Sequence, residues 1–302
     1  MRTALRIAVV AAIGALAATA SAGPRIVTTT EGLAAVAREV AGDRATVESL
    51  SRGVQDPHFV DANPLFAVKL RGADLLVDIG LELEAGWLPP LVTQSRNARI
   101  QPGGPGRFTA ASAVTVLEVP TGTVDRSQGD IHPGGNPHLL ADPRRAVKVA
   151  MALAERLAAI DAGGAAGYRQ RAAAFSTRMD AALARWQAQL APVKGRALFT
   201  HHRTLVYFLE WTGLRSAGEM EPRPGVPPPP AHLADLVQLA KRDGVKAAVV
   251  ESYYDARSAE LVARLSGARL VVIPGDVGGN PAARGYEPWI DILVARIAEA
   301  LR

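Results

Sequence analysis

The feature that most constrains the fold is a long amphipathic stretch in the middle of the chain, residues 165–190. Its large apolar side chains recur every three or four positions, as on one face of a helix: Tyr168, Phe175, Met179, Leu183, Trp186 and Leu190. At 1.5 Å per residue, such a helix spans roughly 39 Å, about the height of a small domain. We therefore predict one long helix that joins two parts of the molecule. The alternative is a single helix of an all-α domain.

Both flanks of this helix show short apolar runs that alternate with amphipathic segments, a pattern typical of parallel α/β layers. In the first half, strands are expected at residues 25–29, 45–50, 73–79 and 113–119, and helices at 31–41, 64–70 and 82–91. In the second half, strands are expected at 196–199, 215–219, 247–250 and 270–273, and helices at 203–211, 231–242, 256–265 and from Pro288 onward. Asp142 and Pro143 supply the cap and first position of a further helix. The predicted fold class is α/β, with two lobes containing parallel-type sheets joined by one long rigid helix.

The chain divides into four predicted segments: a signal peptide (1–22), an N-terminal lobe (23–142), a helical segment (143–192) and a C-terminal lobe (193–302). Residues 1–22 combine Arg2 and Arg6 with a short apolar run and small residues before Gly23, as secretory signals do. The apolar run is shorter than the roughly 20 residues that span a membrane. The chain has no cysteine to accept a lipid, so we expect a free periplasmic protein that is not lipid-anchored.

Composition argues against several other classes of protein. The 302 residues are 48% hydrophobic, which is enough for two cores and excludes a disordered or fibrous chain. The net charge is +5, but Lys and Arg are scattered and form no dense basic run of the nucleic-acid-binding kind. We expect a monomer that binds no nucleic acid.

Histidines follow several of the predicted strands. His58 follows the second strand, His138 lies at the end of the first half, and His201 and His202 follow the first strand of the second half. Ligands of open α/β layers bind beyond the carboxyl ends of strands, so loops from both halves would meet in the cleft between them. Neutral imidazoles brought together in this way make a nitrogen-rich metal site. Taken singly, each could instead be an ordinary hydrogen-bonded residue.

Several motifs carry a family resemblance: Asp56-Pro-His58, the run from Gly135 to Pro143, the run from Ile160 to Tyr168, and His202 with Tyr207-Phe208. In order and spacing, over nearly the whole mature chain, they resemble the periplasmic zinc/manganese solute-binding proteins of ABC importers, the cluster A-I metal-binding family. The resemblance implies two four-stranded lobes joined by a rigid helix, with a divalent metal in the interlobe cleft. It also implies a binding protein rather than an enzyme, which delivers the metal to a membrane permease, with a periplasmic metallochaperone as a further candidate partner.

Carried over residue by residue, the resemblance makes His58, His138 and His202 metal ligands and gives the fourth, acidic position to Asp276. Glu251, which ends the preceding strand, is an alternative ligand or a hydrogen-bond partner for a ligating imidazole. Three imidazoles and one carboxylate suit tetrahedral Zn²⁺, whereas Mn²⁺ favours more oxygen ligands. Zinc is therefore the predicted metal.

The Gly-, Asp- and Ser-rich segment 121–137 is a candidate metal-capture loop through Asp125, Asp130 and His132; the alternative is a solvated loop without a metal role. The sequence leaves two alternative functions open. A secreted zinc-dependent hydrolase would use three protein ligands plus water and would need an open coordination position and a general base. A binding protein for a metal chelate or another organic solute would use the histidines to contact its ligand.

Overall fold

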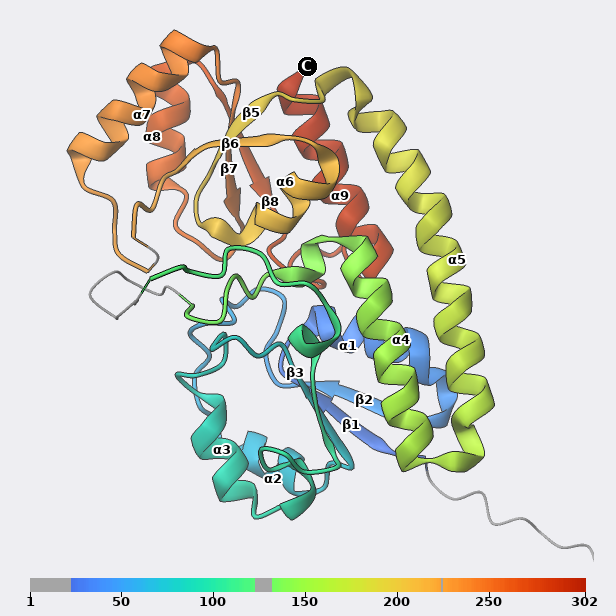
Figure 1. Cartoon of the computed structure of the whole chain (residues 1–302). Helices are drawn as coiled ribbons and strands as arrows, with labels where there is room; N and C mark the ends of the chain where they lie inside the picture. Colours follow the sequence, from blue (N-terminus) through green and yellow to red (C-terminus); the bar gives the residue numbers. More distant parts are fainter. Residues whose placement is uncertain (1–22, 123–131, 224) are drawn as a thin grey trace, which may run out of the picture.

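Two four-stranded parallel sheets, one in each half of the chain, form the framework of the molecule (Figure 1). The computed structural model describes residues 23–122, 132–223 and 225–302, so the predicted signal peptide and residues 125 and 130 lie outside the described part. The first sheet has the order β2-β1-β3-β4, and the second has the equivalent order β6-β5-β7-β8. The strands are β1 (Arg25–Thr28), β2 (Thr46–Ser49), β3 (Leu75–Asp78), β4 (Arg107–Thr109), β5 (Ala197–Thr200), β6 (Arg215–Glu219), β7 (Ala247–Glu251) and β8 (Arg269–Ile273). The prediction of two parallel α/β lobes is confirmed.

Helices cover both faces of each sheet, which explains why the central strands β3 and β7 are buried at every position. The helices are α1 (Glu31–Ala41), α2 (Pro64–Arg71), α3 (Leu88–Ser95), α4 (Pro143–Ile160), α5 (Ala165–Leu190), α6 (Val206–Thr212), α7 (Pro230–Asp243), α8 (Arg257–Ser266) and α9 (Tyr286–Leu301). Asp142 caps α4, with its side chain accepting a hydrogen bond from the backbone N–H of Arg144, as the sequence predicts.

The long helix α5 spans both lobes (Figure 1). Near its start, Arg171 donates to the backbone carbonyl of Val40 in α1 at 2.7 Å. Near its end, the indole N–H of Trp186 donates to Asp291 of α9 at 2.6 Å. Its apolar face belongs to one core that continues through α1, α4 and α9. The two lobes are therefore joined by a helix whose two halves are anchored to different lobes.

Two elements of the first half differ from the prediction. Residues 113–119 form no strand: the backbone N–H of Leu117 bonds the Tyr207 hydroxyl (3.1 Å), and its carbonyl accepts from Asn136, so these groups are taken up outside the sheet. The fourth strand is instead β4, a three-residue segment that pairs with β3. The helix predicted at 82–91 begins later, at Leu88.

The later start of this helix, at Leu88, has a local cause, because the Glu84 side chain turns back onto the end of β3. Its carboxylate accepts hydrogen bonds from the backbone N–H groups of Ile79 and Gly80. Leu81 and Glu82 have φ of 57° and 65°, which interrupts helical geometry there.

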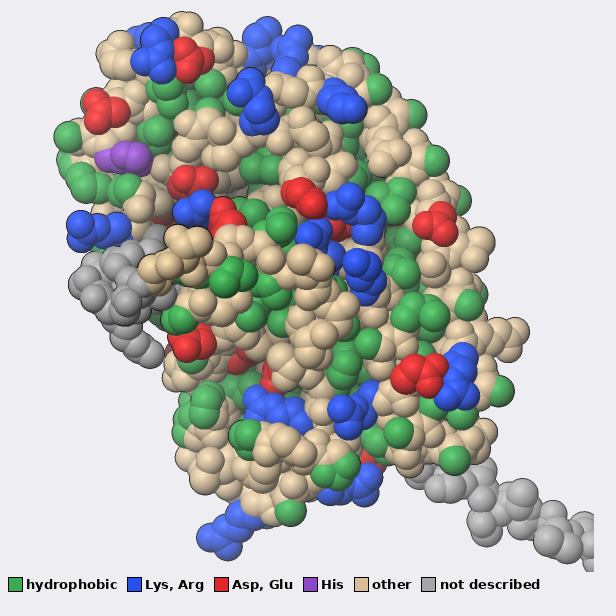
Figure 2. Space-filling model, viewed as in Figure 1, with side chains coloured by type: hydrophobic (Ala, Val, Ile, Leu, Met, Phe, Trp, Pro, Cys, Tyr) green, Lys and Arg blue, Asp and Glu red, His purple; other side chains and the backbone are tan. Residues whose placement is uncertain are grey.

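No helix in the described ranges is long and apolar enough to cross a membrane. On the face shown in Figure 2, Lys and Arg side chains are scattered among Asp and Glu.

Candidate metal centre

Three histidine side chains from separate loops converge between the two lobes. His58 lies in the loop between β2 and α2, His138 lies shortly before α4, and His202 follows β5. Their candidate ligand nitrogens all lie within 4.8 Å of one another. The ring centroids are 5.1, 5.3 and 5.4 Å apart, so the rings form a nearly equilateral triangle. We call these three residues the histidine triad.

Carboxylates orient two of the triad rings. Asp56 Oδ1 lies 2.7 Å from Nδ1 of His58 and also accepts from the His58 backbone N–H at 2.9 Å. Glu221 Oε2 lies 3.2 Å from Nδ1 of His202. Because a nitrogen facing a carboxylate carries the hydrogen, Nε2 of each ring keeps its lone pair for a metal.

The same contacts keep these carboxylates ionised. Burial acts to raise the pKa of Glu221, but its bonds to His201 and His202 outweigh burial and lower that pKa to about 2. Burial likewise opposes ionisation of Asp56, yet its bonds to His58 lower the pKa of that carboxyl below its usual range.

His138 presents a nitrogen that is unused within the described protein. Its Nε2 is buried and has no hydrogen-bond partner among the described residues. Burial lowers the pKa of His138 well below 6.5, and burial also lowers the pKa of His202 although Glu221 opposes this. At neutral pH these imidazoles are uncharged. A buried polar nitrogen without a partner is costly unless something binds it, which fits a ligand for a cation.

Asn136 and Tyr207 tie the loop of His138 to the second lobe. The side-chain carbonyl of Asn136 accepts from the His138 backbone N–H at 3.0 Å, and its amide donates to the carbonyl of Arg203 at 2.9 Å. The Tyr207 hydroxyl donates to the backbone carbonyl of Asn136 at 2.6 Å. A ligand loop of the first lobe is thus positioned by residues of the second.

His132 lies beside the triad. Its Nε2 is 3.3 Å from Nε2 of His58, and the two ring centroids are 5.3 Å apart. Burial, with a smaller effect from His58, lowers the pKa of His132 to about 4. His132, His138 and His202 line one pocket of about 440 Å³. Since Asp125 and Asp130 fall outside the described residues, the capture-loop prediction stays a prediction.

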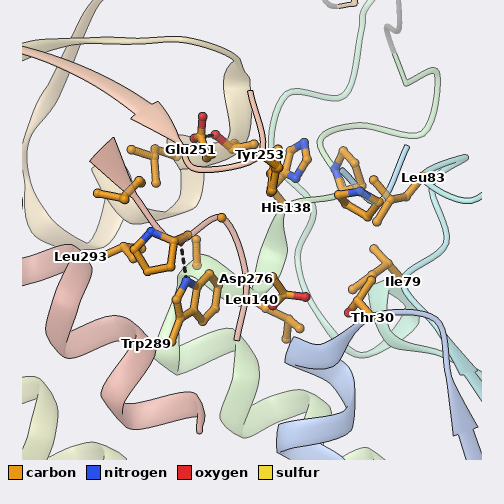
Figure 3. A pocket seen from close by; sticks show the side chains of 18 residues that line it. Thr30, Ile79, Leu83, His138, Leu140, Glu251, Tyr253, Asp276, Trp289 and Leu293 are labelled. Atoms are coloured by element: carbon orange, nitrogen blue, oxygen red, sulfur yellow. Dashed lines mark hydrogen bonds between the residues drawn. The ribbon is translucent and has the colours of Figure 1, made fainter. Parts of the chain in front are cut away.

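Asp276 lies at the same interface between the lobes but is bonded elsewhere. Its Oδ2 accepts from the backbone N–H of Gly32 in α1 at 3.0 Å, and its Oδ1 from that of Val277 at 2.8 Å. A Cβ at position 32 would lie 2.5 Å from Oδ1, so this approach requires glycine. Figure 3 shows Asp276 beside the first turn of α1. Burial raises its pKa to about 7. Its carboxylate is not part of the group of nitrogens that gather at the triad.

Glu251 is buried at the end of β7. One carboxylate oxygen accepts from the Thr204 hydroxyl, and the other has no partner among the described residues. Burial raises the pKa of Glu251 to about 7. Glu251, Asp276 and His138 line a cavity of about 60 Å³ (Figure 3). The structure therefore places Glu251 near the triad without making it a member.

Besides His132, two further histidines lie outside the triad, His201 and His232. Nε2 of His201 lies 3.4 Å from Glu221 Oε1, and its ring packs on Tyr254 with centroids 4.6 Å apart. His232 lies on α7, with its Nε2 2.8 Å from the carbonyl oxygen of Glu219. Of the adjacent pair His201 and His202, only His202 reaches the triad.

Sequence reasoning missed the role of Glu221 and gave Asp56 no separate role. Glu221 follows the end of β6 by two residues, so the rule that ligands gather at the carboxyl ends of strands could have found it. An Asp two positions before a His can bond the backbone and ring of that His, which is a local signal for Asp56.

Comparison with known proteins finds metal-uptake proteins, some named for zinc and others for manganese. A family model described as ZnuA, zinc-uptake complex component A, periplasmic, matches residues 26–300. The chain is 24% identical to the high-affinity zinc uptake system protein ZnuA of Paracoccus denitrificans, with 96% of each chain covered. It is also 24% identical to the zinc-binding lipoprotein AdcA of Streptococcus pneumoniae, covering 73% of this chain but only 43% of AdcA. The chain thus spans less than half the length of that relative.

The fold is shared with solved structures. A crystal structure of ZnuA superposes with a TM-score of 0.78 at 22% identity, covering 93% of this chain and all of the other.

Proposed function

The chain belongs to the ZnuA family of periplasmic zinc-uptake components, and on that premise we propose that it binds zinc in the interlobe cleft and delivers it to the membrane permease of an ABC importer. The observation that carries this proposal is the histidine triad, whose nitrogens gather within 4.8 Å. Two triad rings are oriented by carboxylates, and the third presents a buried nitrogen that no described residue bonds. Imidazoles held in this way are donors that zinc prefers.

The chemistry of the triad supports zinc over manganese. Manganese sites favour carboxylate, carbonyl and water oxygens, whereas this group consists of imidazole nitrogens. Asp276 and Glu251 remain the acidic candidates for a fourth position. Asp276 would have to leave the backbone N–H groups of Gly32 and Val277 to reach the metal.

The proposal extends to location and partners. Residues 1–22 would direct export to the periplasm, where the protein would act as a monomer free of a lipid anchor. Its partner is the permease, with a metallochaperone as a candidate donor of zinc. Neither a zinc hydrolase nor a chelate-binding protein gains support from the comparisons, since the relatives are named as metal-uptake or metal-binding proteins.

We expect the purified mature chain to bind about one zinc ion, because one triad is present in the described chain. Zinc binds the folded state preferentially, so free zinc at 100 times Kd should add about 2.7 kcal/mol to the free energy of unfolding. Metal analysis after gel filtration and thermal unfolding with and without zinc measure both quantities. A protein that takes up no zinc and is not stabilised by it would contradict the proposed function.

The Glu221→Gln variant should bind zinc about 10- to 100-fold more weakly, the usual cost of losing a partner that orients a ligating imidazole. The amide keeps the size of the side chain but removes the charge that faces Nδ1 of His202. Glu219→Gln is the matched control, since the Glu219 carboxylate accepts from Ser216 rather than from a histidine. Chelator competition measures both affinities, and equal losses in the two variants would refute the role given to Glu221.

A further inference from the structure

The contact between His132 and His58 has the spacing of two ligands on one metal ion. Their Nε2 atoms are 3.3 Å apart. In a tetrahedral zinc site with Zn–N bonds of about 2.0–2.1 Å, neighbouring nitrogens are about 3.3–3.4 Å apart. The two atoms that face one another therefore already have the separation that a shared zinc ion requires.

The ring of His58 is oriented for this contact. Asp56 Oδ1 lies 2.7 Å from Nδ1 of His58, so the opposite nitrogen, Nε2, faces His132. The backbone of Leu81 lies near the His132 ring and opposes the lowering of its pKa by burial. A carboxylate behind one ring nitrogen is the arrangement that commonly orients metal-ligating imidazoles.

Charge and hydrogen bonding favour a neutral fourth donor. The carboxylates of Asp56 and Glu221, bonded to triad rings, already supply two negative charges opposite a divalent cation. Both oxygens of Asp276 accept backbone hydrogen bonds, which a move to the metal would break. His132 gives up no such bond and lines the same pocket as His138 and His202.

We propose that His132 is the fourth protein ligand, so that four imidazoles hold the zinc ion: His58, His132, His138 and His202. This inference rests on the proposed function, since it names a ligand of the same site. His132 contacts His58 of the triad and lines one pocket with His138 and His202. A site of nitrogens alone disfavours manganese, so His132 also sets the selectivity for zinc.

The test compares His132→Ala and His132→Gln with His232→Ala, a histidine that bonds the Glu219 carbonyl outside the triad. X-ray absorption of the zinc-loaded proteins counts imidazole ligands, and chelator competition gives affinities for zinc and manganese. We expect four imidazoles in the parent and in His232→Ala, but three in both His132 variants. Zinc affinity should fall at least about 10-fold in these variants. This is the smallest loss expected when a residue that hydrogen-bonds a ligating imidazole is removed, and loss of a ligand should cost no less. The preference of these variants for zinc over manganese should narrow.

The outcomes separate this inference from the proposed function. A parent protein that binds no zinc contradicts the function itself. A parent that binds zinc through three imidazoles, with unchanged affinity in the His132 variants, overturns the role of His132 and leaves the function standing. Slower loading with unchanged affinity also overturns it, because His132 would then only capture the ion. A larger loss in Asp276→Asn than in His132→Ala would assign the fourth position to Asp276.

Discussion

Replacing His138 with alanine is expected to weaken zinc binding by more than about 100-fold. This exceeds the loss of affinity that is usual when a residue that only hydrogen-bonds a ligating imidazole is removed. The reason is geometric: His138 Nε2 is buried, bonded to no described residue, and grouped with the other triad nitrogens. The variant leaves two triad nitrogens, His58 and His202, fewer than the three or four protein ligands that zinc sites use. Chelator competition at pH 7.5 measures the loss.

The fold should survive this change, since the ring nitrogen removed supports no hydrogen bond among the described residues. Thermal unfolding of the metal-free variant checks this point. His232→Ala is the matched control, because it also removes an imidazole but one that lies outside the triad. If His138→Ala keeps the parent affinity, or if both variants lose equally, the triad is not the binding site.

The long helix was predictable because its signal is local and repeated over many turns. The face of α5 that carries Tyr168, Phe175 and Trp186 is buried as the spacing indicates. Strand β4 was not predictable in the same way. It has three residues, and its pairing with β3 depends on partners about 30 positions earlier in the chain, such as Leu76 opposite Arg107. Short elements defined by distant partners leave little periodic signal.

The residues of the site fall into the same two groups, those with a local sequence signal and those without one. The loops that carry His58, His138 and His202 follow from strand ends and motifs, and the structure brings these three rings together. The bond between Asp276 and Gly32 joins residues 244 positions apart, and neither residue signals it locally. The contact of His132 with His58 likewise joins residues 74 positions apart. Contacts between residues so distant in the chain require coordinates.

Zinc affinity should fall steeply on acidification, with its onset below pH 6.5. Metal-ligating imidazoles must be neutral, so each ring that takes up a proton costs about 10-fold in affinity per pH unit. Burial lowers the pKa values of His138 and His202 below the ordinary 6.5. These rings therefore stay neutral, and available to the metal, at pH values where exposed histidines are already charged. Chelator competition from pH 7.5 to 4.5 measures the affinity at each pH. Zinc binding that is unchanged at pH 4.5 would exclude a histidine site, because protons would then not compete with the ion.

The same shifts predict the pH dependence of the metal-free fold. Because the folded pKa values of His138 and His202 are depressed, the unfolded chain binds protons below pH 6.5 that the folded chain does not. Stability of the metal-free protein should therefore fall as pH decreases from 6.5 toward the folded pKa values. His138→Ala should show a smaller fall, whereas His232→Ala should follow the parent.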